Sequence, residues 1–542
     1  MIAYFYFTQN IFFRKVLKMK NKDFCGIFKL WNLLRGNPNK KAQMCPEKRK
    51  HMLEIFTAKP EETGVPSKAI LNLLKRLDGF HIPMHSVLVM RHSRLIFEGY
   101  YAPWKKGELH RMFSVSKSFT SLAIGKLAEE GKIHLDDPIT KYFPEYVSEK
   151  THPWVMQTTI RNMLEMRTCH SLTTYKSYLD RNWVESFFVI EPNHKPGTVF
   201  HYDTSSSHTL CALVEKLTGK PMLDYLKDTV LREIGFSENS YMLKDPFGTS
   251  MGGSGLMATP EDFLRFGMLL MNRGQIDGKQ LISREYLEKA RSVQVENLVK
   301  GGDIFEQQGY GYQFWCGADD SFMCFGMGGQ FILCFPKQDL LCVTTADTQG
   351  IKGGHQQMLN VVCEELLPGL SESPLPAAES DWQELEEYGR QLHIKSVKEV
   401  WGGQHTFLSE KAENTGKGMM QQDKLEYDIC ENEQGFEWMQ FDFAAGIFRF
   451  RLKGEEYQVR FGEDELAVDT WNLCGMRYGA SGLWLDGNTF YIRIMLLDTA
   501  CGSIHMQFYL EEEDMTVFMK KDDEMFFSEF VGHLYGKRAV TH

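Results

Sequence analysis

The sequence predicts a mixed α/β fold of the α+β kind, followed by a separate all-β domain. Three observations predict it. Helical and strand periodicities follow one another in blocks through the first part of the chain, a segment rich in proline, serine and alanine follows at 368–381, and strand alternation dominates the rest. A chain of 542 residues is also long enough for more than one domain.

The composition is that of an ordinary globular protein, with 43% hydrophobic and 24% charged residues. A net charge of −10 disfavours nucleic acid as a partner. The 12 cysteines are scattered and form no CxxC pair, a pattern that favours reduced thiols in a cytosol over a disulfide framework or a zinc site. We therefore expect a cytoplasmic protein without a bound metal.

The first 57 residues are basic and lack a clear periodicity, so we expect residues 1–57 to be a poorly ordered leader. Its apolar start, 1–13, is shorter than the ~20 residues of a transmembrane helix, and basic residues follow it instead of preceding it as in a secretory signal. A membrane-surface anchor at 1–35 is the alternative. Internal methionines that offer later starts are Met19, Met44 and Met52.

Residues 58–368 are predicted to form one domain in which helices and strands surround the segment at Ser114. The stretch "SKAILNLLKRLDG" has apolar residues at helical spacing, a polar start and a glycine stop, and it predicts a helix at 67–79. The other expected elements are two strands within 85–101 around a turn at His92–Ser93, a helix from Ser114 to Gly131, a long mixed region to about residue 320, two strands within 331–347 and a closing helix at 355–367.

Residues 369–381 are predicted to be a linker, and residues 382–542 a β-rich domain. Segments such as "GIFRFRLKG" and "EEYQVRFG" alternate apolar and polar residues. The stretch "LWLDGNTFYIRIMLL" places a turn signal, Asp486-Gly487, between two strands. We expect an antiparallel domain and favour a small barrel. The tail contains no recognisable catalytic constellation.

The stretch "FSVSKSFT" places Lys117 three residues after Ser114 at the start of a predicted helix. Positions i and i+3 lie on one helix face, so the hydroxyl and the amine are neighbours. A serine is a weak nucleophile unless a base takes its proton, and a lysine is a base only as the free amine. Burial and the unpaired N–H groups of a helix start favour that form. The pair is either a nucleophilic site or an ordinary polar helix face.

The flanks of this pair carry further motifs. Residues 111–145 read "RMFSVSKSFTSLAIGKLAEEGKIHLDDPITKYFPE". The segments that follow in order are "TTIRNMLEMRT", "KPGTVFHYDTSSSHTLCALVEKLTGKP", "GGSGLMATPEDFLRFGMLLMNRG" and "FGMGGQFILCFP". Together they resemble the active-site segments of the serine β-lactamase-related hydrolases, a family that includes class C β-lactamases, D-alanyl-D-alanine peptidases, esterases and amidases. The resemblance covers about residues 60–368.

The resemblance implies an antiparallel sheet flanked by helices and joined to an all-helical region, with the site between them and without a metal or organic cofactor. It implies that Ser114 is the nucleophile, Lys117 the base or proton shuttle, and Tyr202 the group that passes the proton to the leaving group. The oxyanion would bind two backbone N–H groups. One belongs to Ser114 and the other to Met327, which follows the third-motif glycine, Gly326.

Two positions depart from the family pattern. The second motif has Thr204 where asparagine is usual, and a hydroxyl offers fewer donors than an amide. The third motif has Cys324 where lysine or histidine is usual, so the cation that would hold a substrate carboxylate is missing. Gly328 and Gly329 would let the strand edge approach the substrate closely. We therefore expect a serine hydrolase that acts on a small ester or amide without that carboxylate.

Three alternatives stay open. One is a β-lactamase or D-alanyl-D-alanine carboxypeptidase, and another is a catalytically weak binding module of the same fold. The third is a different nucleophile, Ser250, because "GTSMG" matches Gly-x-Ser-x-Gly. That motif needs a strand before it and a helix after it, whereas both flanks of Ser250 read as loop. The next helix start is expected at Thr259–Pro260.

Overall fold

The computed structural model describes residues 54–178, 181–298, 302–402, 419–522 and 527–539. The chain divides into two compact units with the boundary between His393 and Ile394. The described residues before this boundary are called the first unit and those after it the second unit. Residues 1–53 of the predicted leader lie outside the described residues.

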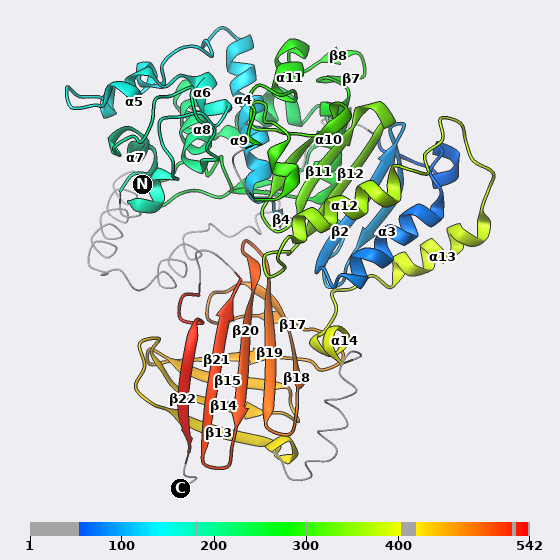
Figure 1. Ribbon diagram of the computed structural model, residues 1–542, viewed down its shortest axis with the longest axis vertical. Coiled ribbons are helices and arrows are strands. Elements are labelled where there is room, and N and C mark those ends of the chain that lie inside the picture. Colours follow the sequence, from blue (N-terminus) through cyan, green and yellow to red (C-terminus); the bar gives the residue numbers. More distant parts are fainter. Residues whose placement is uncertain (1–53, 179–180, 299–301, 403–418, 523–526, 540–542) are drawn as a thin grey trace, which may run out of the picture. The chain divides into compact units, whose positions relative to one another are not determined.

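The first unit is built on a seven-stranded sheet (Figure 1). Its strands, in order across the sheet, are β1 (Phe56–Thr57), β3 (Arg94–Tyr100), β2 (Met84–Arg91), β12 (Leu340–Ala346), β11 (Gln330–Phe335), β10 (Phe322–Gly326) and β9 (Trp315–Cys316). All neighbours are antiparallel except β1 and β3, which are parallel. The pairing of β2 with β12 joins two hairpins that are far apart in the sequence.

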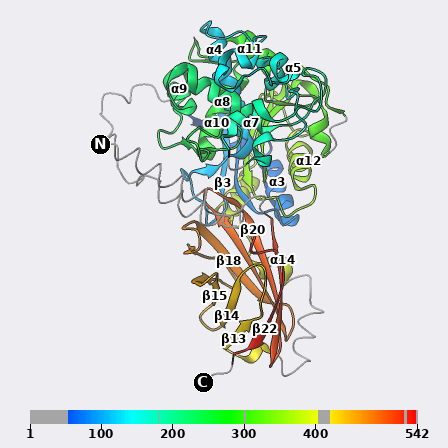
Figure 2. The ribbon, with the colours of Figure 1, turned by 90° about the vertical axis from the view of Figure 1, so that its left-hand side faces the viewer.

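Helices cover both faces of this sheet (Figure 2). The helix α3 (Ser67–Gly79) packs against α12 (Gly354–Leu366) on one face. The helix α10 (Pro260–Met271) packs against β11 and β12 on the opposite face, where Gly267 lies close to Leu341 and Ile332. Coverage on both faces explains why β11 and β12 are buried at every position instead of alternating.

An all-helical region adjoins the α10 face. Its helices are α4 (Ser116–Glu129), α5 (Pro153–Gln157), α6 (Ile160–Leu164), α7 (Trp183–Val189), α8 (Thr204–Thr218), α9 (Met222–Leu226) and α11 (Arg284–Ala290). The short strands around it are β4 (His110–Arg111), β5 (Tyr241–Met242), β6 (Leu256–Ala258), β7 (Gln275–Ile276) and β8 (Lys279–Gln280). The central helix is α4, which packs against α8 and α9, and its Phe119 ring stacks on Phe266 of α10 with centroids 3.8 Å apart.

The fold class predicted for this part of the chain is confirmed, with one local difference at the site. The predicted helix at 67–79 is α3, and Thr259 caps α10 through a reciprocal pair of hydrogen bonds with Asp262. The helix expected from Ser114 starts as a 3₁₀ turn, Phe113–Val115, and becomes α-helical only at Ser116. Its first turn is therefore tighter than expected.

The ends of the first unit differ from the predicted domain limits. Phe56 and Thr57, placed in the leader, form β1 on β3. The predicted linker runs into the helix α13 (Glu379–Arg390), which packs against α3 and whose Tyr388 hydroxyl donates to Asp78. Because α13 is held by these contacts, the boundary between the units falls after it and not at residue 381.

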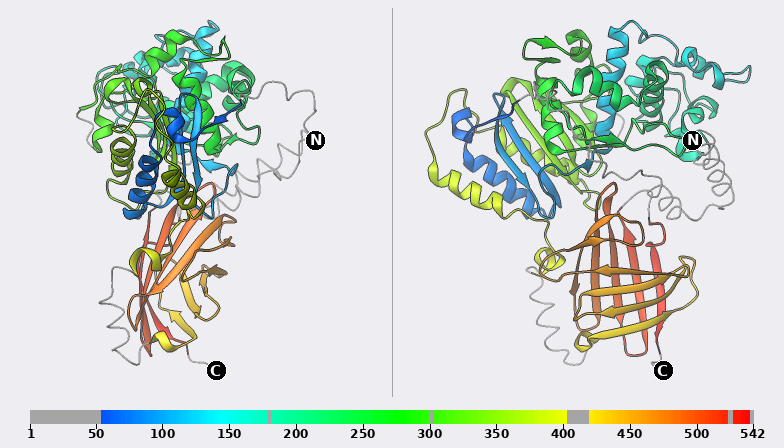
Figure 3. Two further views of the ribbon diagram at one scale, coloured as in Figure 1. Left: turned by 90° about the vertical axis from the view of Figure 1, so that its right-hand side faces the viewer. Right: turned by 180° about the vertical axis from the view of Figure 1, so that it is seen from behind.

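The second unit is a ten-stranded antiparallel sheet that curls into a near-barrel (Figure 3). In order across the sheet its strands are β16 (Glu455–Arg460), β15 (Ile447–Leu452), β14 (Phe436–Asp442), β13 (Lys424–Ile429), β22 (Gly532–Arg538), β21 (Asp514–Lys521), β20 (Cys501–Leu510), β19 (Thr489–Leu497), β18 (Arg477–Trp484) and β17 (Ala467–Thr470). One short helix, α14 (Val397–Trp401), precedes them. The predicted all-β domain is thus confirmed, with the Asp486-Gly487 turn between β18 and β19.

Alternating side chains fill the interior of the near-barrel, as the period of two predicts. In β15, for example, Phe448 and Phe450 are buried whereas Arg449 and Arg451 are half-buried. In neither unit does the described chain contain a helix with the length and apolar character needed to cross a bilayer.

Candidate active site

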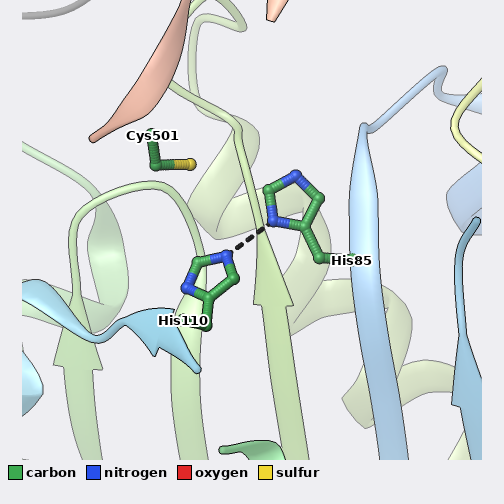
Figure 4. Close-up of side chains that lie close together, drawn as sticks. All are labelled: His85, His110 and Cys501. Carbon is green, nitrogen blue, oxygen red and sulfur yellow. Dashed lines mark hydrogen bonds between the residues drawn. The ribbon is translucent and has the colours of Figure 1, made fainter. Parts of the chain in front are cut away.

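Ser114 follows a short strand that is fixed to the main sheet. The strand β4 pairs with β6, and His110 on β4 is hydrogen-bonded to His85 on β2, with Nε2 and Nδ1 2.7 Å apart (Figure 4). In the next turn Phe113 has φ of 43°, a left-handed conformation that is strained for a residue with a side chain. Such strain persists only where the surrounding structure holds the backbone in place. The segment that carries Ser114 is therefore rigid.

Lys117 and Ser114 lie together, as their spacing predicts. Lys117 Nζ is 2.9 Å from Ser114 Oγ. It is also 3.3 Å from Thr204 Oγ1 in the first turn of α8, and 2.7 Å from the carbonyl oxygen of Gly253 in the loop before β6. Lys117 is only 1% exposed, so these three groups replace water around its nitrogen.

The three neighbours match the hydrogen-bonding capacity of an uncharged amine. A neutral lysine nitrogen has two N–H donors and one lone pair. The Gly253 carbonyl only accepts and takes one N–H, and the Thr204 hydroxyl takes the other. The lone pair then faces the proton of the Ser114 hydroxyl. This arrangement allows a neutral Lys117 to accept the proton of the Ser114 hydroxyl.

Burial is the main cause of the shifted pKa of Lys117. Desolvation lowers its pKa to about 7, and the positive charge of Lys176 acts in the same direction. The opposing influence is Asp203, whose carboxylate favours the ammonium form. Desolvation wins, so a large fraction of Lys117 is the free amine near neutral pH.

Tyr202 lies beside the pair, two residues before the start of α8. Burial raises the pKa of this phenol above its usual 10, and the Ser114 side chain acts in the opposite direction. Lys117 Nζ lies 4.8 Å from the centroid of the ring, a distance at which the aromatic face stabilises a cation. Tyr202 therefore stays a neutral phenol, suited to relay a proton, whereas Lys117 is the stronger candidate for the base.

Gly326, the last residue of β10, approaches the segment that carries Ser114. A Cβ atom at Gly326 would lie 2.4 Å from the Met112 carbonyl oxygen and 3.2 Å from the Ser114 nitrogen, so only glycine fits. Within the part of the chain that the structure describes, the N–H groups of Ser114 and Met327 donate no hydrogen bond. Two unengaged N–H groups on adjoining segments are the arrangement that binds an oxyanion.

The turn after Gly326 is held in a conformation that requires glycine. Gly328 and Gly329 have φ of 90° and 95°, which residues with side chains rarely adopt. The buried Gln330 side chain donates to the Met327 carbonyl at 2.9 Å, and Thr344 Oγ1 donates to the Gly329 carbonyl at 2.9 Å. The end of β10 and the turn that follows it therefore form a fixed wall beside Ser114.

The two departures from the family pattern have clear structural consequences. The Thr204 hydroxyl is engaged by Lys117. Cys324 is 1% exposed, and burial raises the pKa of its thiol to about 12, so it is neutral. Cys324 therefore supplies no cation at the position where the third motif usually carries one.

The competing serine lies in a different setting. Ser250 pairs with Lys244 in an isolated β-bridge, and its N–H lies 3.5 Å from a carboxylate oxygen of Glu215. Both flanks are loop, as expected, and the next helix is α10. Ser250 therefore lacks the strand-to-helix turn that its motif needs.

The sequence analysis did not identify two groups that contribute to the site, Asp203 and the Gly253 carbonyl. Asp203 is fully buried and caps α8 by accepting from the N–H groups of Ser205 and Ser206, at 2.8 and 3.1 Å. An aspartate before "TSSSH" was an available capping signal. The Gly253 carbonyl had no such signal, because a backbone acceptor in a loop leaves no mark on residue type.

Comparison with known proteins gives the same outline. A family model described as Beta-lactamase matches residues 72–357, more than half of the chain. The 6-aminohexanoate-dimer hydrolase of Paenarthrobacter ureafaciens is 24% identical over 284 residues, covering 47% of this chain and 70% of that protein. Protein flp of Staphylococcus aureus (strain MW2) is 25% identical over 205 residues, covering 34% of this chain and 41% of flp, less than half of that relative's length.

Solved structures also match. One is EstCE1, described as a hydrolase with promiscuous acyltransferase activity, with a TM-score of 0.45 and 18% identity over 54% of this chain and 99% of that chain.

The reactivity of Ser114 should follow the ionisation of Lys117. Since the free amine is the base, the rate of labelling by a fluorophosphonate should rise with pH and level off above about 7, the pKa of Lys117. Rates measured between about pH 5.5 and 8.5 test this. Lys117→Arg, which stays charged, should label slowly throughout. A flat profile, or normal labelling of Lys117→Arg, would contradict this role.

Adding one methyl group at Gly326 should disable the site. Gly326→Ala pushes β10 away from Met112 and Ser114, so Ser114 labelling should slow about a hundredfold, the usual effect of losing an oxyanion donor. Gly79→Ala is the matched control, because a Cβ at Gly79 meets open space. Equal labelling rates for both variants would show that β10 does not need to lie so close.

Proposed function

Because the chain belongs to the beta-lactamase family, we propose that it is a serine hydrolase that cleaves small esters or amides through an acyl-enzyme at Ser114. One observation carries the proposal. The buried amine of Lys117 lies 2.9 Å from Ser114 Oγ, with its remaining hydrogen-bonding capacity directed to Thr204 and Gly253. A polar helix face has no need of a lysine that is stripped of water.

Acylation begins with proton transfer from Ser114 to Lys117. The serine oxygen attacks the substrate carbonyl carbon, and the carbonyl oxygen becomes an oxyanion that accepts from the N–H groups of Ser114 and Met327. The proton that Lys117 has gained moves through the Tyr202 hydroxyl to the leaving alkoxide or amine. The ring of Tyr202 stabilises the ammonium form of Lys117 while the proton resides there.

Deacylation repeats these steps with water. Lys117, a free amine again after the leaving group has departed, takes a proton from a water molecule, directly or through Tyr202. The hydroxide oxygen attacks the acyl carbon, the second oxyanion binds the same two N–H groups, and Ser114 recovers its proton as the acid is released. Every proton taken up in one half-reaction is thus returned in the same half-reaction.

The missing cation of the third motif favours substrates without a carboxylate. An anion in a cleft loses hydration and needs a partner charge to offset the cost. Cys324 is neutral and buried, so β10 offers none. We therefore favour an ester or amide over a β-lactam or a peptidyl-D-alanine. The curated relative named 6-aminohexanoate-dimer hydrolase supports including its namesake dimer among the test compounds.

A substrate panel on matched serine variants tests the proposal. Wild type should hydrolyse short p-nitrophenyl esters, and Ser114→Ala should lower kcat by a factor of about 10³ or more, as loss of a nucleophile does. Ser250→Ala should keep the wild-type rate. Spectrophotometric assays with these esters, amides, the 6-aminohexanoate dimer and nitrocefin decide among the alternatives.

The outcomes of the panel are distinct. Fast nitrocefin turnover with slow ester turnover would favour a β-lactamase. Absence of turnover and of fluorophosphonate labelling would favour a binding module. Activity lost in Ser250→Ala but kept in Ser114→Ala would identify the other serine as the nucleophile.

The charge of the substrate should matter in a predictable direction. A p-nitrophenyl butyrate and the mono-p-nitrophenyl ester of glutaric acid have similar length, but only the second carries a carboxylate. We expect kcat/KM to be about tenfold or more higher for the neutral ester, because the anion finds no cation on β10. Comparable or higher values for the anionic ester would contradict the proposed substrate class.

A further inference from the structure

His355, in the first turn of α12, faces the turn that carries Met327. Its Nε2 lies 3.2 Å from the N–H of Gly328, and its ring meets the Phe325 ring edge to face, with centroids 4.8 Å apart. Behind the imidazole, Asp303 Oδ2 lies 3.8 Å from Nδ1. Three separate segments of the first unit thus meet at one histidine.

The hydrogen bond from Gly328 fixes one end of a peptide group whose other end is also fixed. The peptide between Met327 and Gly328 presents its carbonyl oxygen to the Gln330 amide, at 2.9 Å, and its N–H to His355. On the far side of Gly328, the Gly328 carbonyl accepts from Thr348 N–H at 3.0 Å. With these contacts in place the peptide plane cannot rotate.

Rotation at this point would disturb the proposed oxyanion site directly. The Met327 N–H belongs to the preceding peptide, which shares the Met327 Cα with the fixed one. Gly328 has φ of 90° and no side chain, so its own sterics restrain the turn weakly. Without the contact from His355, Gln330 and Thr348 still hold the two carbonyl oxygens of the turn, but the N–H between them loses its acceptor and the flexible Gly328 can let the Met327–Gly328 peptide tilt.

We propose that His355 is a positioning residue, which holds the Met327–Gly328 peptide so that the Met327 N–H points at the reacting oxygen. The inference rests on the proposed function, because an oxyanion forms only if Ser114 attacks a substrate. His355 does not touch the substrate itself. It acts through the backbone of the turn.

The role requires His355 in its neutral form, with Nε2 unprotonated and Nδ1 carrying the hydrogen. Burial lowers the pKa of His355 and favours this form, while the carboxylate of Asp303 acts in the opposite direction. The sheet side presents the Phe325 ring and the turn presents the Gly328 N–H, neither of which is charged. When Nε2 gains a proton, two donors face each other and the hydrogen bond to Gly328 is lost.

Two substitutions separate positioning from packing. In His355→Gln the side-chain amide oxygen reaches about as far as Nε2 and accepts from Gly328, so kcat for p-nitrophenyl butyrate should stay within about threefold of wild type. In His355→Leu the acceptor is gone, and kcat should fall about tenfold to a hundredfold with KM little changed, as misplaced oxyanion donors cost. Equal kcat values for the leucine variant and wild type would overturn the proposal.

The pH profile gives a readout that a packing role would not move. In wild type a plot of log kcat against pH should have a slope of one on the acid side and, at lower pH, a slope approaching two. The slope increases because Lys117 and then His355 gain protons. His355→Gln should keep a slope of one. Asp303→Asn removes the group that raises the pKa of His355, so the steepening should move to lower pH. The same slope of two in His355→Gln would overturn the proposal.

A measurement without substrate separates this inference from the proposed function. In protein labelled with ¹⁵N-histidine, the His355 resonances, assigned by their absence in His355→Gln, should show the tautomer with hydrogen on Nδ1 near pH 7.5. Hydrogen on Nε2 would overturn the proposal whether or not esters are cleaved. If the protein shows the expected tautomer but hydrolyses no ester, the contact between His355 and Gly328 stands and the proposed hydrolase function is refuted.

Discussion

The site depends on one constraint: the Lys117 nitrogen is buried away from water, and the groups that it contacts carry no negative charge. Three segments far apart in the sequence meet at Lys117 to satisfy it: the start of α4, the start of α8 with Thr204, and the loop that carries the Gly253 carbonyl. Each offers an uncharged partner. Burial therefore destabilises the charged ammonium form of Lys117 relative to the free amine, and this lowers the pKa of Lys117 to about 7.

The opposite wall of the site is set by how closely two backbones can approach. The Met112–Ser114 segment and the end of β10 lie so near that Gly326 has no room for a Cβ atom. That contact leaves the N–H groups of Ser114 and Met327 on adjoining segments, while side chains such as Gln330 hold the turn behind them. In the proposed mechanism Lys117 activates the Ser114 hydroxyl, and the two N–H groups beside Gly326 bind the negative charge that forms on the substrate oxygen.

The sequence predicted what local patterns can encode. Periodicity and caps located α3 and α10, alternation located the second unit, and the spacing of Ser114 and Lys117 put a hydroxyl beside an amine. Contacts between segments that are distant along the chain produce no local pattern in the sequence. The Gly253 carbonyl and the His355 contact with Gly328 arise from loop geometry. Composition also misled, because the region rich in proline and serine leads into α13, which packs on the first unit.

The most direct test of this account is the titration of Lys117 itself. In protein labelled with ¹³C,¹⁵N-lysine, NMR can follow each side chain with pH, and Lys117→Arg identifies the resonance. The account predicts a resonance, absent from that variant, that titrates near pH 7, as the lowered pKa requires. A Lys117 resonance that remains that of an ammonium group up to about pH 10 would contradict the free-amine base on which the hydrolase proposal depends.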